Sequence, residues 1–424
     1  MTSKTSSQPR IEWLDMLRAL CAIEIAGHHW LRACLHVHLF ENTSVSKQFR
    51  NFIWSYKNNN AGTQLFQNFP NPLLLDSQNS FSAALTNFTG FLFGFGWEAV
   101  NVFILLSGFS LALGLGDWPE RAKEYWMGWY KRRLKRILFP YYLIAGILLF
   151  SYIFIYLGSS LPFFDPVRPK IQEKIGKGWL ELLVSQVFLI SPWQSSLKAT
   201  FFSPAWWFIP AIIVAYLFFP FFFWILAKFG SKALLGFTFL VSTVSYWLSA
   251  KGVPVEENAL YHVILFESFN FTLGMVLGRW FSQPAKRAKL EALVSKPIAI
   301  AVGVLLVLAG NLMNWFEPLY PLSSIFFTSG LVIVGINISN LFLGIPIVSK
   351  LKKIDSYMFY LIHQLLAYII ALVLSYILRA YTTSLGILIY FAAVLLATSI
   401  FLKFYLWLEG KALLWLQNRK PSTG

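Results

Sequence analysis

Charged residues are scarce in this chain. Only 13% of its 424 residues are Asp, Glu, Lys or Arg, whereas a soluble protein carries about 25%. Together with 57% hydrophobic residues and a mean hydropathy of +0.58, this deficit excludes a soluble globular protein and indicates an integral membrane protein. The net charge of +16 is typical of basic cytoplasmic loops. We therefore predict the lipid bilayer as a partner, and no nucleic acid.

Cysteine is equally rare, with two residues in the whole chain. Cys21 and Cys34 lie on the first apolar segment, about 19 Å apart if that segment is helical, so they cannot form an internal disulfide. The short polar stretch 1–10 precedes an apolar run that is too long and too charged for a cleavable signal peptide. We expect this run to remain as the first membrane span.

Apolar runs of about 20 residues, long enough to cross a ~30 Å hydrocarbon layer, recur along the chain. We predict about ten spans with both termini cytoplasmic, because roughly two-thirds of the Lys and Arg residues fall in loops on one side. No linker divides the chain, so the expected fold is all-α, a single polytopic transmembrane bundle over 1–424 in the plasma or inner membrane. Segment 179–190 is too short to span and is expected to be an interfacial or re-entrant helix. The predicted spans are 12–39, 83–113, 137–158, 204–227, 233–250, 260–281, 297–313, 323–346, 357–379 and 385–408.

The first span carries ionisable residues where a simple anchor would carry none, namely Asp15, Arg18, Glu24, His28 and His29. Each costs roughly 2.5–3.5 kcal/mol at the centre of a bilayer, so several on one helix indicate a polar path with a function. Arg18 and His29 face within ~20° of each other, about 16.5 Å apart along a helix. Glu24 lies one helical turn before His28. We therefore expect Glu24 to contact His28 rather than His29. The alternative is that these groups only make structural contacts between helices.

The second span contains Glu98 and Asn101, three residues apart on one helix face, followed by Ser107 and Gly108. Ser107 and Gly108 form a small surface on which a ligand or another helix can approach closely. A close helix crossing explains these two residues as well as a functional role does.

A basic stretch precedes the third span and contains Arg132, Arg133 and Arg136. In a helix their spacing gathers the guanidinium groups at the membrane surface. Guanidinium groups bind phosphate in a bidentate manner, so this face suits the phosphates of coenzyme A. A topology signal or a contact with anionic lipid is the alternative interpretation.

Together these stretches resemble integral-membrane acyltransferase family 3. The matching elements occur in the family's order over roughly residues 10–370, and each is weak on its own. One departure concerns Ile212 and Ile213, where many polysaccharide-modifying members carry a Glu pair, so the acceptor class stays open. The elements are Leu14 to Arg18 followed by ten residues and His29, Ala99 to Phe109, Arg132 to Tyr141, the set Trp207, Tyr216 and Pro220, and Ser356 to His363.

The resemblance implies an acyltransferase that moves an acyl group, commonly acetyl, from cytoplasmic acyl-coenzyme A to a hydroxyl of a glycan or another acceptor. Acyl-coenzyme A is then a co-substrate. His29 fits a general base, and His363 is either a second catalytic group or a structural partner. The candidate residues are His29, Arg18, Asp15 and His363 for catalysis, Arg132, Arg133, Arg136, Arg18 and Ser107 for coenzyme A, and Asn101, Glu98, Trp207 and Tyr360 for the acceptor.

Two other functions remain open from the sequence. The intramembrane Asp, Glu and His residues also suit a transporter that relays protons or binds a solute. A binding or scaffold protein is the third possibility.

His36 and His38 are more typical of a membrane interface than of a ligand pair, so no metal is expected. Direct transfer and a covalent acyl-enzyme are both compatible with the same residues.

Overall fold

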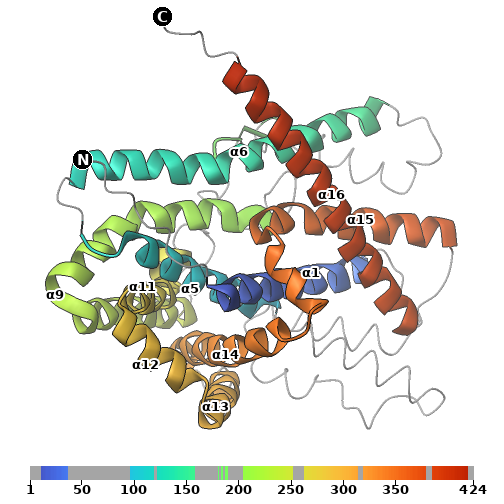
Figure 1. Ribbon diagram of the computed structural model, residues 1–424. Helices are drawn as coiled ribbons and strands as arrows, with labels where there is room; N and C mark the ends of the chain where they lie inside the picture. Colours follow the sequence, from blue (N-terminus) through green and yellow to red (C-terminus); the bar gives the residue numbers. More distant parts are fainter. Residues whose placement is uncertain are drawn as a thin grey trace, which may run out of the picture.

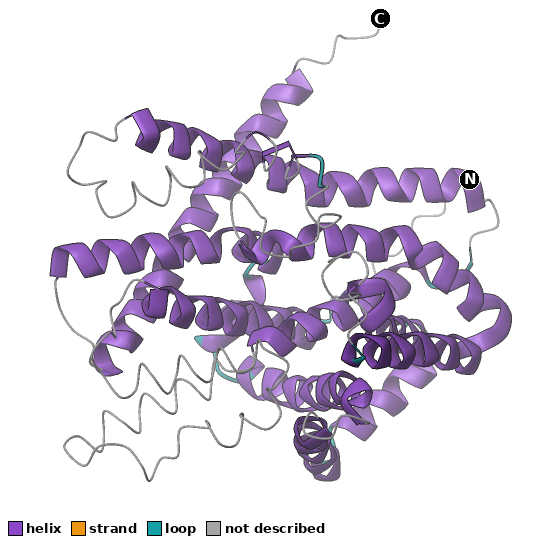
Figure 2. Ribbon diagram, turned by 180° about the vertical axis from the view of Figure 1, so that it is seen from behind, coloured by secondary structure: helices purple, strands orange, loops and turns teal. Residues whose placement is uncertain are grey.

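The computed structural model describes residues 11–36, 96–118, 122–157, 180, 183–184, 187–189, 204–251, 262–313, 319–378 and 384–418. These residues form helices and short connections, and no strand occurs among them, which confirms the all-α prediction for this part of the chain (Figure 2). The helices are α1 (Glu12–His36), α5 (Gly96–Leu115), α6 (Ala122–Leu157), η3 (Pro204–Trp207), α9 (Phe208–Ala250), η4 (His262–Phe266), α11 (Ser268–Phe281), α12 (Pro284–Val294), α13 (Pro297–Met313), α14 (Tyr320–Leu343), η6 (Val348–Lys353), α15 (Ser356–Leu378) and α16 (Ser384–Asn418).

Every predicted span overlaps one of these helices, although residues 83–95 lie outside the described part. Within the described residues, three helices are long and apolar enough to cross a membrane, and a fourth span results if α12 and α13, bent by 76°, count together. Large apolar side chains such as Phe150, Leu240 and Ile400 are exposed, as lipid-facing positions require. The protein is therefore a helical membrane protein, and the number of ten spans and the cytoplasmic termini remain predictions.

Helix α9 accounts for two of the predicted spans. Its 43 residues would extend about 65 Å if straight, more than twice the hydrocarbon thickness. The chain turns at Gly230, whose φ of 84° and ψ of 175° are not helical, and Figure 1 shows α9 changing direction at one edge of the molecule. Glycine adopts this conformation without the Cβ penalty of other residues. The two parts correspond to the predicted spans 204–227 and 233–250.

Helices α5 and α11 contact each other closely, and glycine makes this contact possible. A Cβ atom added to Gly108 would meet the carbonyl oxygen of Phe271, and one added to Gly274 would meet that of Leu105. The two backbones therefore touch directly, as in small-residue crossings of membrane helices. The sequence left a close helix crossing at Ser107 and Gly108 open, and the structure has this crossing at Gly108.

Helix α6 lies along one side of the bundle, above α9 and α15 in Figure 1. Tyrosine hydroxyls attach it at three points: Tyr130 donates to Leu217 O at 2.9 Å, Tyr357 to Ile137 O at 2.9 Å, and Tyr142 to Val187 O at 2.8 Å. Val187 belongs to the predicted interfacial segment 179–190, most of which lies outside the described residues.

Candidate active site

A cavity of about 1250 Å³ lies between α6 and helices α1, α5, α9 and α15. It is larger than the ~300–1000 Å³ typical of small-molecule sites, so it suits a large ligand. Five basic side chains line it, against only two acidic ones, Asp15 and Asp355. We call it the arginine cavity; its basic residues are Arg18, Arg132, Arg133, Lys135 and Arg136.

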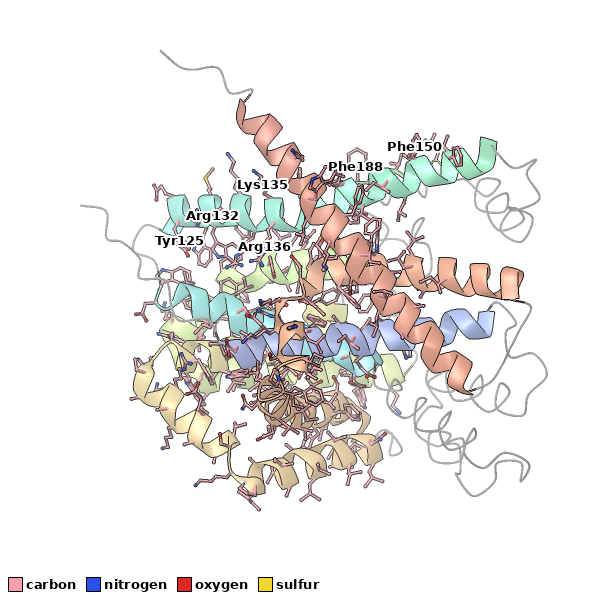
Figure 3. The ribbon with its side chains drawn as sticks, turned by 45° about the vertical axis from the view of Figure 1, so that its right-hand side comes forward. Tyr125, Arg132, Lys135, Arg136, Phe150 and Phe188 are labelled. Carbon is pink, nitrogen blue, oxygen red and sulfur yellow. The ribbon has the colours of Figure 1, made fainter. Side chains whose placement is uncertain are left out.

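The three arginines of α6 face Arg18 of α1 across this cavity, although they are more than a hundred residues apart in the sequence. Figure 3 shows Arg136 on the side of α6 that faces the other helices. Arg133 is half-buried, with its guanidinium group 5.7 Å from the ring centroid of Trp129. Burial lowers the pKa of Arg133, and the neighbouring Arg136 and Arg132 act in the same direction. These cations repel one another, so the cavity favours an anionic ligand.

Two neighbours on different helices hold Arg18. Its Nη1 atom lies 3.3 Å from Oδ1 of Asp15, and its Nη2 atom donates to Oγ of Ser110 on α5. The Ser110 hydroxyl donates in turn to the carbonyl oxygen of Leu106 at 2.6 Å. Because of these contacts, the guanidinium group has a fixed position in the cavity wall.

Asp355, the other acidic residue in the wall, has a structural role. Its Oδ1 atom accepts hydrogen bonds from the backbone N–H groups of Tyr357 and Met358, both at 3.1 Å. It therefore caps the N-terminus of α15, which partly compensates its charge. The cavity keeps an excess of positive charge.

The far end of the cavity from the arginines is apolar. Along α1 the lining continues from Arg18 to Ile25, and along α9 from Tyr216 through Ile212 to Phe208. Ile212, one of the two isoleucines at the family's Glu–Glu position, is therefore part of the wall. Tyr360 completes this end, with its ring 5.6 Å from that of Phe208. A ligand with charged groups at one end and an apolar group at the other would match this gradient.

The two candidate catalytic histidines lie close together, beyond Tyr360. The rings of His29 and His363 are 5.2 Å apart, and Nδ1 of His29 lies 3.3 Å from Nε2 of Gln364. Nδ1 of His363 lies 2.6 Å from the carbonyl oxygen of Tyr360, and the two rings are 5.7 Å apart. Neither histidine lines the arginine cavity. The Tyr360 ring thus borders the cavity and lies next to His363.

The tautomer of His363 follows from this contact. A carbonyl oxygen can only accept, so Nδ1 of His363 must carry a proton. In the neutral ring Nε2 is then the acceptor, and it has no hydrogen-bond partner among the described residues. His363 is fully buried, so its free acceptor nitrogen faces the protein interior.

The other predicted site residues are divided between the cavity and its surroundings. Ser107 lines the cavity together with the predicted phosphate ligands. Glu98 and Asn101 are buried and do not line it; they hydrogen-bond to each other at 3.0 Å. Trp207 is half-buried at the end of η3, with its ring 6.1 Å from that of Phe208. The assigned roles of these residues remain predictions.

Sequence reasoning missed Ser110 and gave no site role to Tyr216. Ser110 lies one helical turn after Ser107, which would have placed both hydroxyls on one face. Tyr216 belongs to the Trp207 motif, and it lies close enough to Arg18, Arg133 and Arg136 to interact with their charges. Both residues line the cavity.

The fold and this cavity define a membrane-embedded helical protein with a large cationic cavity. The chain belongs to acyltransferase family 3: the family model described as "Acyltransferase domain" matches residues 11–403. No match was found among curated proteins or among solved structures. The protein is therefore a membrane acyltransferase, and the family match confirms the resemblance derived from its motifs.

Proposed function

We propose that the protein moves an acyl group, in the first instance acetyl, from cytoplasmic acyl-coenzyme A to a hydroxyl of a glycan or another acceptor on the opposite side of the membrane. The observation that carries the proposal is the arginine cavity, which has phosphate-binding groups at one end and an apolar wall that reaches Tyr360, next to the histidine pair, at the other. We place the enzyme in the plasma or inner membrane, with several spans.

In this proposal the guanidinium groups of Arg132, Arg133, Arg136 and Arg18 bind the pyrophosphate and ribose phosphate of coenzyme A. The pantetheine arm follows the hydroxyls of Ser107 and Tyr216 toward the apolar end. The thioester then lies against Tyr360. Asp15 contributes by orienting Arg18, as their 3.3 Å contact supports.

The reaction requires a base for the acceptor hydroxyl and a donor for the oxyanion of the thioester carbonyl. We propose His29 as the base, with His363 beside it as a second proton carrier or as its structural partner. The hydroxyl oxygen forms a bond with the carbonyl carbon, and the carbon–sulfur bond breaks. The base takes the proton of the hydroxyl and returns it to the coenzyme A thiolate. A rotation of the Tyr360 side chain would bring thioester and histidines together.

The first experiment measures free thiol released from acetyl-coenzyme A by the purified protein in nanodiscs, with and without a glycan acceptor. Thiol release that depends on acceptor supports the proposal, and His29→Ala should abolish it. Wild-type rates in His29→Ala would show that His29 is not the base. Solute flux without thioester consumption would instead indicate a transporter.

A second experiment tests the cavity directly by binding. Charge reversal at Arg133 and Arg136 should weaken acetyl-coenzyme A binding at least tenfold, since two phosphate contacts become repulsive. Lys131→Glu is the matched control, because Lys131 lies on the same helix, is exposed and does not line the cavity. Equal affinities in the folded double variant and the control would indicate that these arginines serve as a topology signal or a lipid contact instead.

A further inference from the structure

A second group of polar residues is buried in the bundle away from the arginine cavity. It comprises two carboxylates, two amides and one hydroxyl, and none of these residues lines the cavity. Polar groups inside a membrane bundle are expensive and usually functional. We call this group the Glu–Asn cluster: Glu98 and Asn101 of α5, Glu267 and Asn270 at the start of α11, and Ser324 of α14.

The cluster arises from the same short motif on two parallel helices. The backbone contacts of α5 with α11 join Leu105 to Gly274 and Phe109 to Gly278, so facing residues differ by 169 in number. Glu98 and Glu267 have this same separation, and so have Asn101 and Asn270. Two Glu-x-x-Asn motifs therefore lie at one level of the bundle, side by side.

Hydrogen bonds join both motifs to Ser324. Nδ2 of Asn101 lies 3.0 Å from Glu98 Oε2 and 3.3 Å from Ser324 Oγ. In the second motif, Nδ2 of Asn270 lies 2.6 Å from Glu267 Oε2 and 3.1 Å from Ser324 Oγ. Ser324 and Tyr246 both donate to Oε1 of Glu267, at 3.1 and 2.8 Å. The two amide nitrogens thus donate to the carboxylate and hydroxyl oxygens of the cluster.

One strong acceptor in the cluster lacks a donor. Asn270 is 1% exposed, and its Oδ1 atom has no hydrogen-bond partner within the described ranges. With Glu267 ionised, the amide cannot be turned over to repair this, because the carboxylate oxygens only accept and Nδ2 must face them. A buried amide oxygen without a donor indicates a bound water, ion or ligand group that is not part of the chain.

The charge of the cluster indicates which kind of group it is. Glu267 is fully buried, and its partners Tyr246, Asn270 and Ser324 are all neutral; no Lys, Arg or His pairs with it in the part of the chain that the structure describes. Glu98 adds a second buried carboxylate nearby. The N-termini of α5 and α11 stabilise negative charge there, but a helix dipole offsets only a small part of the cost of burying an anion.

We propose that the Glu–Asn cluster binds a small monovalent cation of the size of sodium, coordinated by Asn270 Oδ1 with carboxylate and hydroxyl oxygens around it. Hard cations prefer oxygen ligands of this kind. Mg²⁺ is a poor fit because it retains several waters, which a cluster this closed to solvent does not offer. This ion departs from our expectation that the chain holds no metal. It also gives Glu98 and Asn101 a role in ion binding rather than in acceptor binding.

The ion would join α5, α11 and α14 at one level. Helix α5 also carries Ser110, which contacts Arg18 in the cavity wall, and Gly335 of α14 packs against Leu17 of α1. A cation in the cluster therefore stabilises the helices that position the cavity. This inference stands without the proposed acyl transfer, because it concerns binding and stability alone.

The experiment measures thermal unfolding by tryptophan fluorescence at constant pH and ionic strength, with sodium chloride replaced stepwise by choline chloride. We expect the wild-type unfolding midpoint to rise by a few degrees as sodium saturates the site. Glu267→Gln should lose this sodium response, whereas Glu291→Gln, a half-exposed carboxylate on α12 that pairs with Arg287, should keep it. Equal midpoints in sodium and choline for the wild-type protein would overturn the proposal.

Direct binding of ²²Na⁺ to protein prepared in choline buffer gives a readout that does not depend on stability. We expect saturable binding of about one ion per chain, reduced at least tenfold in Ser324→Ala and in Asn270→Leu and retained in Asn270→Asp, which keeps an oxygen at the same place. If Glu267→Gln does not fold, these variants decide the matter. Binding that is equal in Asn270→Leu and the wild-type protein would assign the ion to another site.

Discussion

The arginine cavity and the Glu–Asn cluster are polar regions of the bundle that are built in opposite ways. The cavity gathers like charges, Arg18 with three arginines of α6, and leaves them beside a large open volume. The cluster gathers carboxylates with neutral donors, and its five residues are each less than 9% exposed. In our two proposals, the cavity binds a large ligand that leaves again, and the cluster binds an ion that stays and stabilises the bundle.

The two regions also differ in how their helices are held. At the cluster, α5 and α11 touch through glycine, so the backbone has little freedom. At the cavity, α6 is attached by tyrosine hydroxyls that donate to single carbonyl groups. We therefore expect mutations in the cluster to act on stability, and mutations in the cavity to act on ligand binding.

The largest effect is expected from a mutation that breaks the Glu–Asn cluster. Glu267→Ala removes the acceptor of hydrogen bonds from Tyr246, Asn270 and Ser324 inside the bundle, which should lower the free energy of unfolding by about 3 kcal/mol or more. Arg133→Ala in the cavity wall should change it by less than about 1 kcal/mol. Denaturant unfolding in detergent measures both. Similar losses in the two variants would remove the distinction between the regions.

The next effect tests the helix contact. Gly108→Ala places a methyl group against the backbone carbonyl of Phe271, so the helices must separate, at a cost of about 2–3 kcal/mol. Gly146→Ala on α6 is the matched control, because a Cβ there meets nothing within 4 Å. It should be neutral or stabilise by about 0.5–1 kcal/mol. If Gly108→Ala is as stable as the control, the α5–α11 contact is looser than described.

A smaller effect concerns the charge of the cavity. Affinity for acetyl-coenzyme A should fall about tenfold between ~20 mM and ~500 mM choline chloride, because the arginines are accessible and salt screens them. Dephospho-coenzyme A, with less negative charge, should show a shallower dependence. Isothermal titration measures both slopes, and choline avoids any effect of sodium at the cluster. A flat profile for acetyl-coenzyme A would mean that the arginines do not bind its phosphates.

The smallest effect concerns Ser110, a positioning residue for Arg18. Ser110→Ala should raise the KM for acetyl-coenzyme A about threefold to tenfold with little change in kcat, because one partly buried hydrogen bond to a charged group is lost. Ser110→Thr keeps a hydroxyl and should restore the wild-type KM. A loss of kcat without a change in KM would point to a role in the chemical step instead.

Much of the fold could be predicted from the sequence. Length and hydropathy located the helices, and helical spacing placed the α6 arginines together, because these are local properties of the chain. Arg18 and the α6 arginines face each other through a long-range contact. The family resemblance predicted this contact, and residue spacing did not. Ser110 was missed because a single serine in an apolar run does not indicate a function until its hydrogen-bond partner is known.

The Glu–Asn cluster shows more clearly what could not be predicted from the sequence. The sequence singled out Glu98 and Asn101, and the same motif at Glu267 and Asn270 went unnoticed, although a Glu within an apolar segment is the same signal. What brings the motifs together is the register of two parallel helices, set by Gly274 and Gly278. Register between helices depends on packing over the whole contact, so residue spacing along one segment does not reveal it.

The position of Tyr360 has a consequence for timing. Its ring lines the cationic cavity and lies 5.7 Å from the ring of His363, whereas neither His363 nor His29 lines that cavity. In the proposed reaction, a thioester bound in the cavity would therefore reach the imidazoles only after this one phenol moves. The rate of that side-chain movement would then set an upper limit on turnover.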